Sequence, residues 1–338
     1  MAISIRLPSE SSTPPHYRYR QNFLSPRIWR RILPVVLVFF LLVESYRFLS
    51  TGSPAPPTQL LQDTGAITPS PGGASTAAAA DLDLGPPLTQ LKTLVIVACH
   101  AIWLGGPTAG KEENEWVLES YQRGRNEQIV WGRHIEAGVK AAQEDEGALL
   151  VFSGGETRPG VGPRMEGGSY FDLAVARGLI DAPLLNRTTT ELAALDSYQN
   201  LLFSLLRFHE LTGSYPEHIT LISYAFKKAR FVDSHLAAIK YPETKFTFIG
   251  IDPEGIAEEE MEKIKLGEGK TREMWGKDPY ACHEGGLRGK RRHRNGGRRG
   301  WGYKDTVMEQ TVRGLLGWCR SRGAKGQIWE GGMLPWME

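Results

Sequence analysis

The stretch Leu91-Lys92-Thr93-Leu94-Val95-Ile96-Val97-Ala98 is the most informative part of this 338-residue chain. It is short, almost entirely apolar and rich in β-branched residues, which is typical of a parallel strand buried on both faces. Similar runs lie at 148–152, 219–223 and 245–251, with helical periodicity between them, first at 129–146. Strands that alternate with helices predict an α/β fold with a doubly wound, mainly parallel sheet, whose ligands bind at the carboxyl ends of the strands.

The composition predicts a substantial folded domain without a global excess of charge. The chain is 41% hydrophobic, and 40 Lys and Arg residues nearly balance 38 Asp and Glu residues. So balanced a charge gives no reason to expect a nucleic-acid partner. Cys99, Cys282 and Cys319 show no metal-binding spacing and are too few for a disulfide framework. The sequence leaves one Cys282–Cys319 disulfide as an alternative to free thiols. We expect no tightly bound metal, and the sequence assigns no cofactor.

The N-terminal part of the chain is organised differently from the rest. Residues 1–28 are polar and basic, as in a disordered tail, and 50–88 are rich in Pro, Gly, Ala, Ser and Thr, as in a flexible stem. Between them, 29–49 surround an uncharged apolar run and predict a single-pass transmembrane anchor helix. Basic residues precede it, so the N-terminus is expected in the cytosol and the domain at 89–338 in a lumenal or extracellular space. A cleaved signal peptide and a helix packed on the domain are the alternatives.

A glycine-rich turn follows the second predicted strand. It reads Ser-Gly-Gly-Glu-Thr at 153–157, and Arg158 and Arg164 follow. Paired glycines let the backbone turn sharply and direct N–H groups at an anion, while nearby arginines add charge-assisted hydrogen bonds. The alternative is an ordinary turn at the end of a strand. The candidate ligand-binding residues here are Ser153, Gly154, Gly155 and Glu156.

The next long segment predicts an amphipathic helix that starts at Thr188. Its leucines cover one arc, and polar residues share the opposite arc. Among these, Asp196, Ser197 and Asn200 are spaced so that their side chains converge, as the residues of a site must, although a solvated helix face explains them equally. The first four residues, Thr-Thr-Thr-Glu, fit a capping box, which gives Glu191 a structural role that competes with ligand binding.

Two cations follow the third predicted strand, which ends at Ser223. Lys227 and Arg230 are three residues apart near a helix N-terminus, so both are placed to face one anion. The alternative is that they are ordinary surface cations.

Taken in order, these motifs resemble the DUF218 family, which includes the bacterial YdcF-like, SanA-like and ElyC-like proteins. The resemblance covers roughly 91–299 and is stronger for fungal-type members, which also share His100-Ala101-Ile102-Trp103 and Asp278-Pro279-Tyr280. It implies a Rossmann-like fold and, for the bacterial relatives, a link to cell-envelope biology, but it supplies no reaction. The residues that match the family's central motifs are Ser153-Gly154-Gly155, Glu166, Glu191, Ser197-Tyr198-Gln199-Asn200, Ser223 and Arg230.

Three positions depart from the family's pattern. Cys99 stands where a glycine is usual, Gln199 replaces an acid, and Lys227 replaces the histidine of bacterial members. With an ordinary pKa of about 10.4, Lys227 is a poor acid–base group at neutral pH but a good anion ligand. The departures therefore favour binding over the bacterial chemistry.

A basic segment lies at 287–300, with seven Lys or Arg residues, interspersed glycines and no acid. A solvated loop is the default interpretation, and contact with anionic lipid headgroups is the sharper one. After it, 306–318 has the pattern of a terminal helix that packs on the sheet.

These features favour a membrane-anchored protein that binds or processes a phosphate-bearing or other anionic small molecule, as a hydrolase or transferase if it is an enzyme. The candidate acid–base residues are His100, Glu166 and Asp196. The candidate ligand-binding residues are Ser153, Gly154, Gly155, Glu156, Glu191, Ser197, Asn200, Ser223, Lys227 and Arg230. A non-catalytic membrane-tethered scaffold is one alternative. A methyltransferase-like nucleoside-cofactor binder is another, weakened because no GxGxxG follows the first strand.

Overall fold

The computed structural model describes residues 85–283, 285–295, 303, 307, 309–320 and 326–337. The predicted tail at 1–28, the anchor at 29–49 and most of the stem at 50–88 lie outside these ranges. Within them, no helix is both long enough and apolar enough to cross a bilayer.

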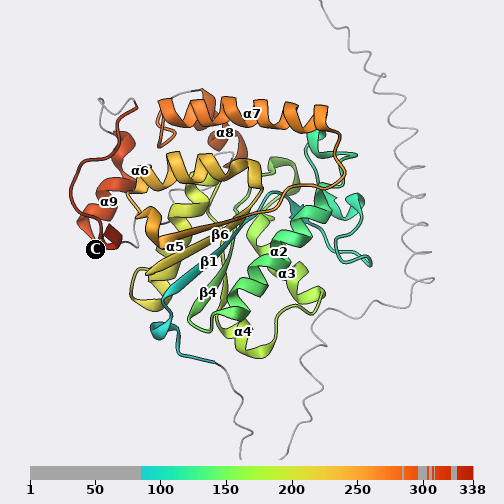
Figure 1. Ribbon diagram of the computed structural model, residues 1–338, viewed down its shortest axis with the longest axis horizontal. Coiled ribbons are helices and arrows are strands. Elements are labelled where there is room, and N and C mark those ends of the chain that lie inside the picture. The colour runs from blue at the N-terminus through green and yellow to red at the C-terminus, as the bar shows by residue number, and fades with distance from the viewer. Residues whose placement is uncertain are drawn as a thin grey trace, which may run out of the picture. The chain divides into compact units, whose positions relative to one another are not determined.

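A five-stranded parallel sheet forms the centre of the domain (Figure 1). Its strands are β1 (Thr93–Ala98), β4 (Ala148–Ser153), β5 (Thr188–Glu191), β6 (His218–Ser223) and β7 (Phe246–Gly250). The spatial order is β5-β4-β1-β6-β7, so the chain starts in the middle, builds one half of the sheet and then returns to build the other. The prediction of an α/β fold with a mainly parallel sheet is confirmed. The order reverses beside β1, where ligands bind in sheets of this kind.

Alternating side chains of the central strands are buried on opposite faces of the sheet. Leu94 and Ile96 of β1 pack against helix α5 (Ser197–Thr212), whereas Val95 and Val97 pack against helices α2 (Glu127–Glu144) and α3 (Glu166–Ala176). Because both faces need apolar contacts, the central strands read as continuous apolar runs. The predicted helix at 129–146 corresponds to α2.

The remaining elements complete the edges of the domain. The smaller helices are α4 (Ala182–Asn186), α6 (Ala237–Ile239) and α9 (Gln310–Leu316), and α9 lies within the predicted terminal helix. The short strands β2 (Ile102–Trp103) and β3 (Trp116–Val117) form an antiparallel pair.

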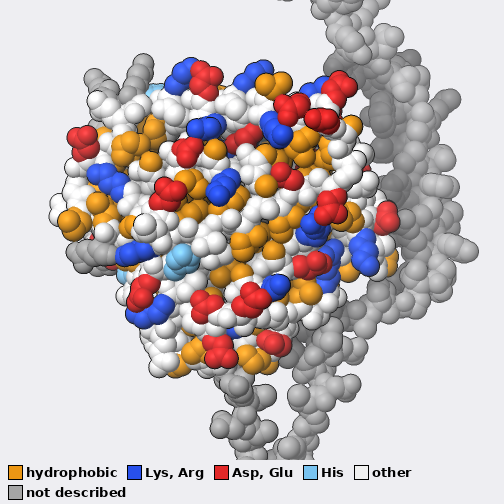
Figure 2. Space-filling model, in the orientation of Figure 1, with side chains coloured by type: hydrophobic (Ala, Val, Ile, Leu, Met, Phe, Trp, Pro, Cys, Tyr) orange, Lys and Arg blue, Asp and Glu red, His pale blue; other side chains and the backbone are white. Residues whose placement is uncertain are grey.

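Helices α7 (Glu258–Lys277) and α8 (Gly286–Asn295) lie together at one end of the domain (Figure 1). Helix α7 packs on a π-helix at Arg230–Leu236, and Cys282, just before α8, is joined to Cys319 by a disulfide. On the face seen in Figure 2, acidic and basic side chains are interspersed, in keeping with the balanced composition.

The helix predicted to start at Thr188 is wrong in its first part. Thr188–Glu191 form strand β5, which pairs in register with β4 from Leu150 to Ser153. The helix begins only at Ser197, where the side chain of Asp196 accepts a hydrogen bond from the Gln199 backbone N–H as its N-cap. Sheet pairing outweighs the capping-box pattern because the β-branched threonines fit a strand.

The interpretation of the basic segment at 287–300 as a solvated loop is also wrong. Its described part is helix α8, and Arg291 is buried, with its guanidinium donating hydrogen bonds to Asp196 and to the Tyr280 carbonyl. Lys290 and Arg294 of the same helix border a cavity instead of facing away from the domain. Any lipid contact by this segment would therefore rest on fewer cations than the sequence suggests.

Candidate functional site

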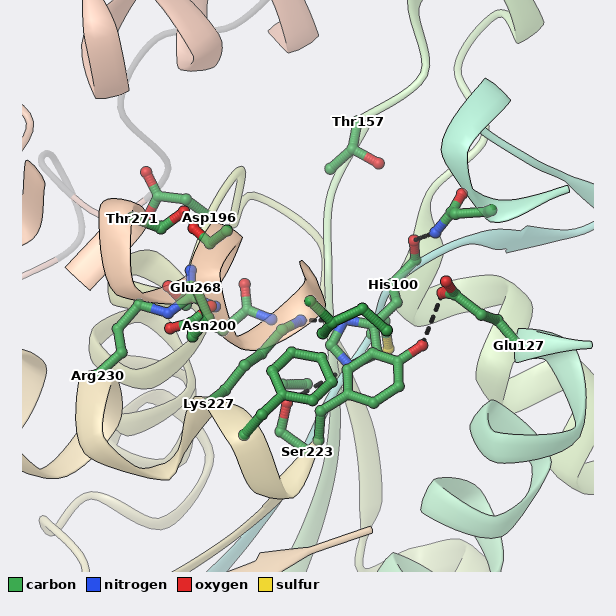
Figure 3. Close-up of a pocket in the computed structure, with 18 of the residues that line it drawn as sticks. His100, Glu127, Thr157, Asp196, Asn200, Ser223, Lys227, Arg230, Glu268 and Thr271 are labelled. Atoms are coloured by element: carbon green, nitrogen blue, oxygen red, sulfur yellow. Dashed lines mark hydrogen bonds and ion pairs between the residues drawn. The ribbon is translucent and has the colours of Figure 1, made fainter. Parts of the chain in front are cut away.

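A cavity of about 510 Å³ lies at the carboxyl ends of β1 and β6, beside the point where the strand order reverses (Figure 3). Its volume is that of a site for a small organic molecule. One wall comes from the residues that follow the two strands and from the start of α5, and the other from α7 and α8. Of the predicted site residues, those that line it are His100, Glu166, Asp196, Ser197, Asn200, Ser223, Lys227 and Arg230.

His100 lies two residues beyond β1 and links the ends of both strands. Its Nε2 is 3.4 Å from Ser223 Oγ, its Nδ1 is 3.4 Å from Lys227 Nζ, and its ring stacks on Tyr224 with centroids 4.7 Å apart. Burial, and then the adjacent cation Lys227, lower the pKa of His100 well below its usual value. The imidazole is therefore neutral at pH 7, with one N–H to donate and one nitrogen to accept.

Lys227 is half-buried in the cavity wall, with its ammonium 4.6 Å from the centre of the Tyr224 ring. Burial, reinforced by nearby Arg230, lowers the pKa of Lys227 below that of an ordinary lysine. The expectation of an ordinary pKa is therefore wrong, because the sequence shows neither the loss of water nor the second cation.

Arg230 is the first residue of the π-helix and forms an ion pair with one carboxylate. Its guanidinium donates a 2.8 Å hydrogen bond to Glu268 of α7, and both side chains are largely buried. The helix α8 adds Arg294, half-buried, and Lys290, at the solvent-facing rim. Among the described carboxylates, none forms an ion pair with Lys227, Lys290 or Arg294. The cavity therefore gathers more positive charge than its own acids neutralise on this side.

Asp196 lines the cavity, but its contacts give it a structural role. Besides capping α5, its carboxylate accepts two hydrogen bonds from the Arg291 guanidinium. Burial raises the pKa of Asp196, yet the charge and hydrogen bonds of Arg291 outweigh this and leave the pKa below its ordinary value. A carboxylate held charged in this way does not exchange protons near neutral pH, so the prediction of Asp196 as an acid–base residue is not supported by its environment.

The glycine turn does not direct its N–H groups into the cavity. Gly154 N–H donates to the Glu191 carbonyl at 2.9 Å, and Gly155 N–H donates to the Ala194 carbonyl at 2.7 Å. The prediction that these N–H groups bind an anion is wrong, because strand β5 and the chain after it supply their acceptors. A Cβ at Gly155 would lie 2.8 Å from two carbonyl oxygens, so close backbone approach explains this glycine.

Ser153, Glu156 and Glu191 are buried outside the cavity lining. Ser153 Oγ donates a 2.9 Å hydrogen bond to the Glu191 carboxylate, and burial raises the pKa of Glu191 to about 7. Asn200 Nδ2 donates to the Ser153 carbonyl at 3.1 Å. Of this network only Asn200 lines the cavity, and Ser153 and Glu191 support it from the buried side.

Glu166 is the first residue of α3, is 4% exposed and faces the cavity. Its carboxylate accepts a hydrogen bond from Thr157 and lies 3.5 Å from the Arg158 guanidinium, which in turn donates to the His100 carbonyl at 2.8 Å. Ser197, at the start of α5, has its hydroxyl 2.8 Å from His235 Nε2. Thr157 and Arg158 thus fix the Glu166 carboxylate in place near the loop that carries His100.

Several lining residues were not predicted from the sequence. Glu268 lies in a strongly charged helix without any motif, and Lys290 and Arg294 belong to the segment interpreted as a loop. Tyr224 is held by hydrogen bonds to Glu127, at 2.8 Å, and from Trp131. Of these residues, only Lys290 and Arg294 could have been suspected from the sequence, because they belong to the basic run at 287–300. Within the described residues, no group of His, Cys, Asp and Glu side chains is arranged to hold a metal ion.

Comparison with known proteins places this chain in a family. The chain is 30% identical to Uncharacterized protein YOR238W of Saccharomyces cerevisiae (strain ATCC 204508 / S288c), over 47% of this chain and 67% of the yeast protein. This chain belongs to the family of that yeast protein. No family model and no solved structure matches it. The similarity to the yeast protein indicates shared ancestry and does not itself indicate a function.

Proposed function

We propose that this chain binds a phosphate-bearing or other anionic small molecule in the cavity at the carboxyl ends of β1 and β6. The observation that carries the proposal is the convergence of Lys227, Lys290 and Arg294 on this cavity without carboxylate partners among the described residues. Holding like charges together where water is partly excluded costs free energy unless a counter-ion offsets it. An anionic ligand would supply that charge.

The apolar part of the cavity lining suits the organic part of such a ligand. Phe226, Phe231, Ile264 and Leu287 contribute apolar surface to the lining. A cavity that combines cations with apolar surface favours a molecule that joins an anionic group to a larger carbon framework. The volume exceeds the needs of a bare inorganic anion.

Thermal unfolding of the full chain tests this proposal. Nucleotides, sugar phosphates and polyprenyl phosphates would be added separately, and a ligand at a hundred times its Kd should stabilise the protein by about 2.7 kcal/mol. The shift should be smaller in Lys290→Gln, which removes a rim cation, but not in Lys270→Gln, which removes an exposed lysine of α7. No shift with any class, or equal shifts in both variants, would contradict the proposal.

The same proposal extends to the reaction class and the family. If the chain turns over its ligand, the acid–base groups of the cavity lining include the neutral His100, 3.4 Å from Lys227, and Glu166, and a hydrolase or transferase acting on an anionic substrate fits them. A DUF218-type, Rossmann-like domain agrees with the sequence motifs and with the strand order, and the apolar run within 29–49 supports a membrane anchor. Deleting 1–49 should release the protein from the membrane fraction, and retention there would contradict the anchor.

A further inference from the structure

The amine of Lys227 is oriented within the cavity by groups from two strand ends. It lies 3.4 Å from His100 Nδ1 and above the Tyr224 ring, which is itself stacked between His100 and Phe226. Figure 3 shows the Lys227 side chain extended toward His100, away from the Arg230–Glu268 pair. An amine that donates one N–H to an imidazole nitrogen keeps its lone pair free when it is not protonated.

The charged groups around Lys227 come from the π-helix, α7, α2 and α8. Arg230 and Lys290 disfavour its ammonium form, whereas Glu268 and Glu127 favour it. Glu268 forms an ion pair with Arg230, and the Glu127 carboxylate accepts a hydrogen bond from the Tyr224 hydroxyl. Because burial and the two cations outweigh the two acids, a larger share of Lys227 is a neutral amine at neutral pH than of any ordinary lysine.

We propose that Lys227 is the nucleophile of this cavity and forms a Schiff base with an anionic ligand that carries an aldehyde or ketone. The inference rests on the proposed anion site, since Arg230, Lys290 and Arg294 would hold the ligand's anionic group beside the amine. A lysine beside a second cation in a partly desolvated pocket is the arrangement that activates an amine toward carbonyl carbon.

The neighbouring imidazole can carry the protons that this step moves. The Lys227 nitrogen attacks the carbonyl carbon, a C–N bond forms, and the carbonyl π electrons pass to oxygen. His100 Nδ1 takes the proton from the nitrogen and returns it to the oxygen, giving a neutral carbinolamine. A second proton, taken up from solvent, then converts the hydroxyl into leaving water as the C–O bond breaks, and the nitrogen lone pair forms the C=N bond of the protonated imine.

Ser223 is a weaker candidate for the same role. When Lys227 donates to His100 Nδ1, the single N–H of the neutral imidazole lies on Nε2 and points to Ser223 Oγ, 3.4 Å away. In that tautomer His100 donates to the serine and cannot remove its proton. The geometry therefore favours the amine over the hydroxyl as nucleophile.

The experiment uses pyridoxal 5′-phosphate, a phosphate-bearing aldehyde, with the full chain at pH 7. Sodium borohydride fixes any imine, and peptide mass spectrometry locates it. An ordinary lysine is neutral in fewer than about one in a thousand molecules at this pH, so labelling at Lys227 should exceed that at exposed lysines by at least about tenfold. Inorganic phosphate should suppress it. Lys227→Arg should abolish this label, and Lys270→Arg, at an exposed lysine of α7 outside the cavity, should retain it.

Two results would overturn the inference, and they are distinguishable. If pyridoxal 5′-phosphate stabilises Lys227→Arg and the unaltered chain alike, but no adduct forms at Lys227, the anion site stands and the nucleophile is refuted. If the compound neither stabilises the chain nor labels Lys227 above the exposed lysines, both the anion site for this ligand class and the nucleophile fail.

Discussion

Replacing Arg291 with methionine should destabilise the domain far more than a surface substitution would. The Arg291 and Asp196 side chains are 9% and 10% exposed, and the guanidinium also donates to the Tyr280 carbonyl at 2.8 Å. Methionine keeps an apolar stem, but it removes the guanidinium that lies 5.8 Å from the centre of the Tyr198 ring and leaves the Asp196 carboxylate buried without its cation. Removing one partner of such a buried pair costs about 3–5 kcal/mol.

Urea unfolding and thermal unfolding measure this cost. For a domain of this size, Tm should fall by roughly 6–20 °C. The double variant Arg291→Met with Asp196→Asn should recover part of the loss, because asparagine still caps helix α5 and carries no charge. The matched control is Arg272→Met, whose ion pair with Asp233 is half exposed and contributes at most about 1 kcal/mol. A loss below about 1 kcal/mol in Arg291→Met would refute the structural role given to this pair.

Three further predictions concern the framework of the site. Gly155→Ala should lower the free energy of unfolding by about 1–3 kcal/mol, because the added Cβ meets backbone carbonyls. Gly160→Ala, with open space around the added Cβ, should change it by less than about 0.5 kcal/mol, and equal effects would contradict the packing argument. Replacing Cys282 and Cys319 with serine opens a loop of 37 residues and should lower stability by about 4 kcal/mol, and an unchanged Tm would count against the disulfide. Burial raises the pKa of Glu191 to about 7, so its contribution to stability is fully present below its ordinary pKa near 4.5 and is lost as the pH rises through 7; Glu191→Gln should remove this decline, and identical pH profiles would argue against it.

The fold was predictable from the sequence where the apolar pattern of a segment is enough to show that the segment is buried. The run at 91–98 is apolar on both alternating faces, and only a strand covered on both sides needs that pattern. Strand β5 was missed because Thr188–Glu191 is polar, and its state depends on pairing with β4. Helix α8 was missed for a similar reason, since its contacts with Asp196 and Leu195 lie nearly a hundred residues away.

One part of the candidate site was predictable because its motifs directly follow a strand. His100, Ser223 and Lys227 each come within a few residues of a strand end, and parallel strands bring those ends to one edge of the sheet. The glycine turn was located correctly, but the acceptors of its N–H groups are set by tertiary packing. Glu268 belongs to a solvent-facing charged helix in the sequence, and only the fold brings it to Arg230.

The central claim is that this cavity binds an anion through the cations at the ends of β6 and on α8. Anomalous diffraction from a crystal of the full chain soaked in tungstate tests it most directly. The account predicts a peak inside the cavity, with tungstate oxygens roughly 3 Å from Lys227 Nζ and from the guanidinium of Arg230 or Arg294. An empty cavity in a crystal that binds tungstate elsewhere would contradict it.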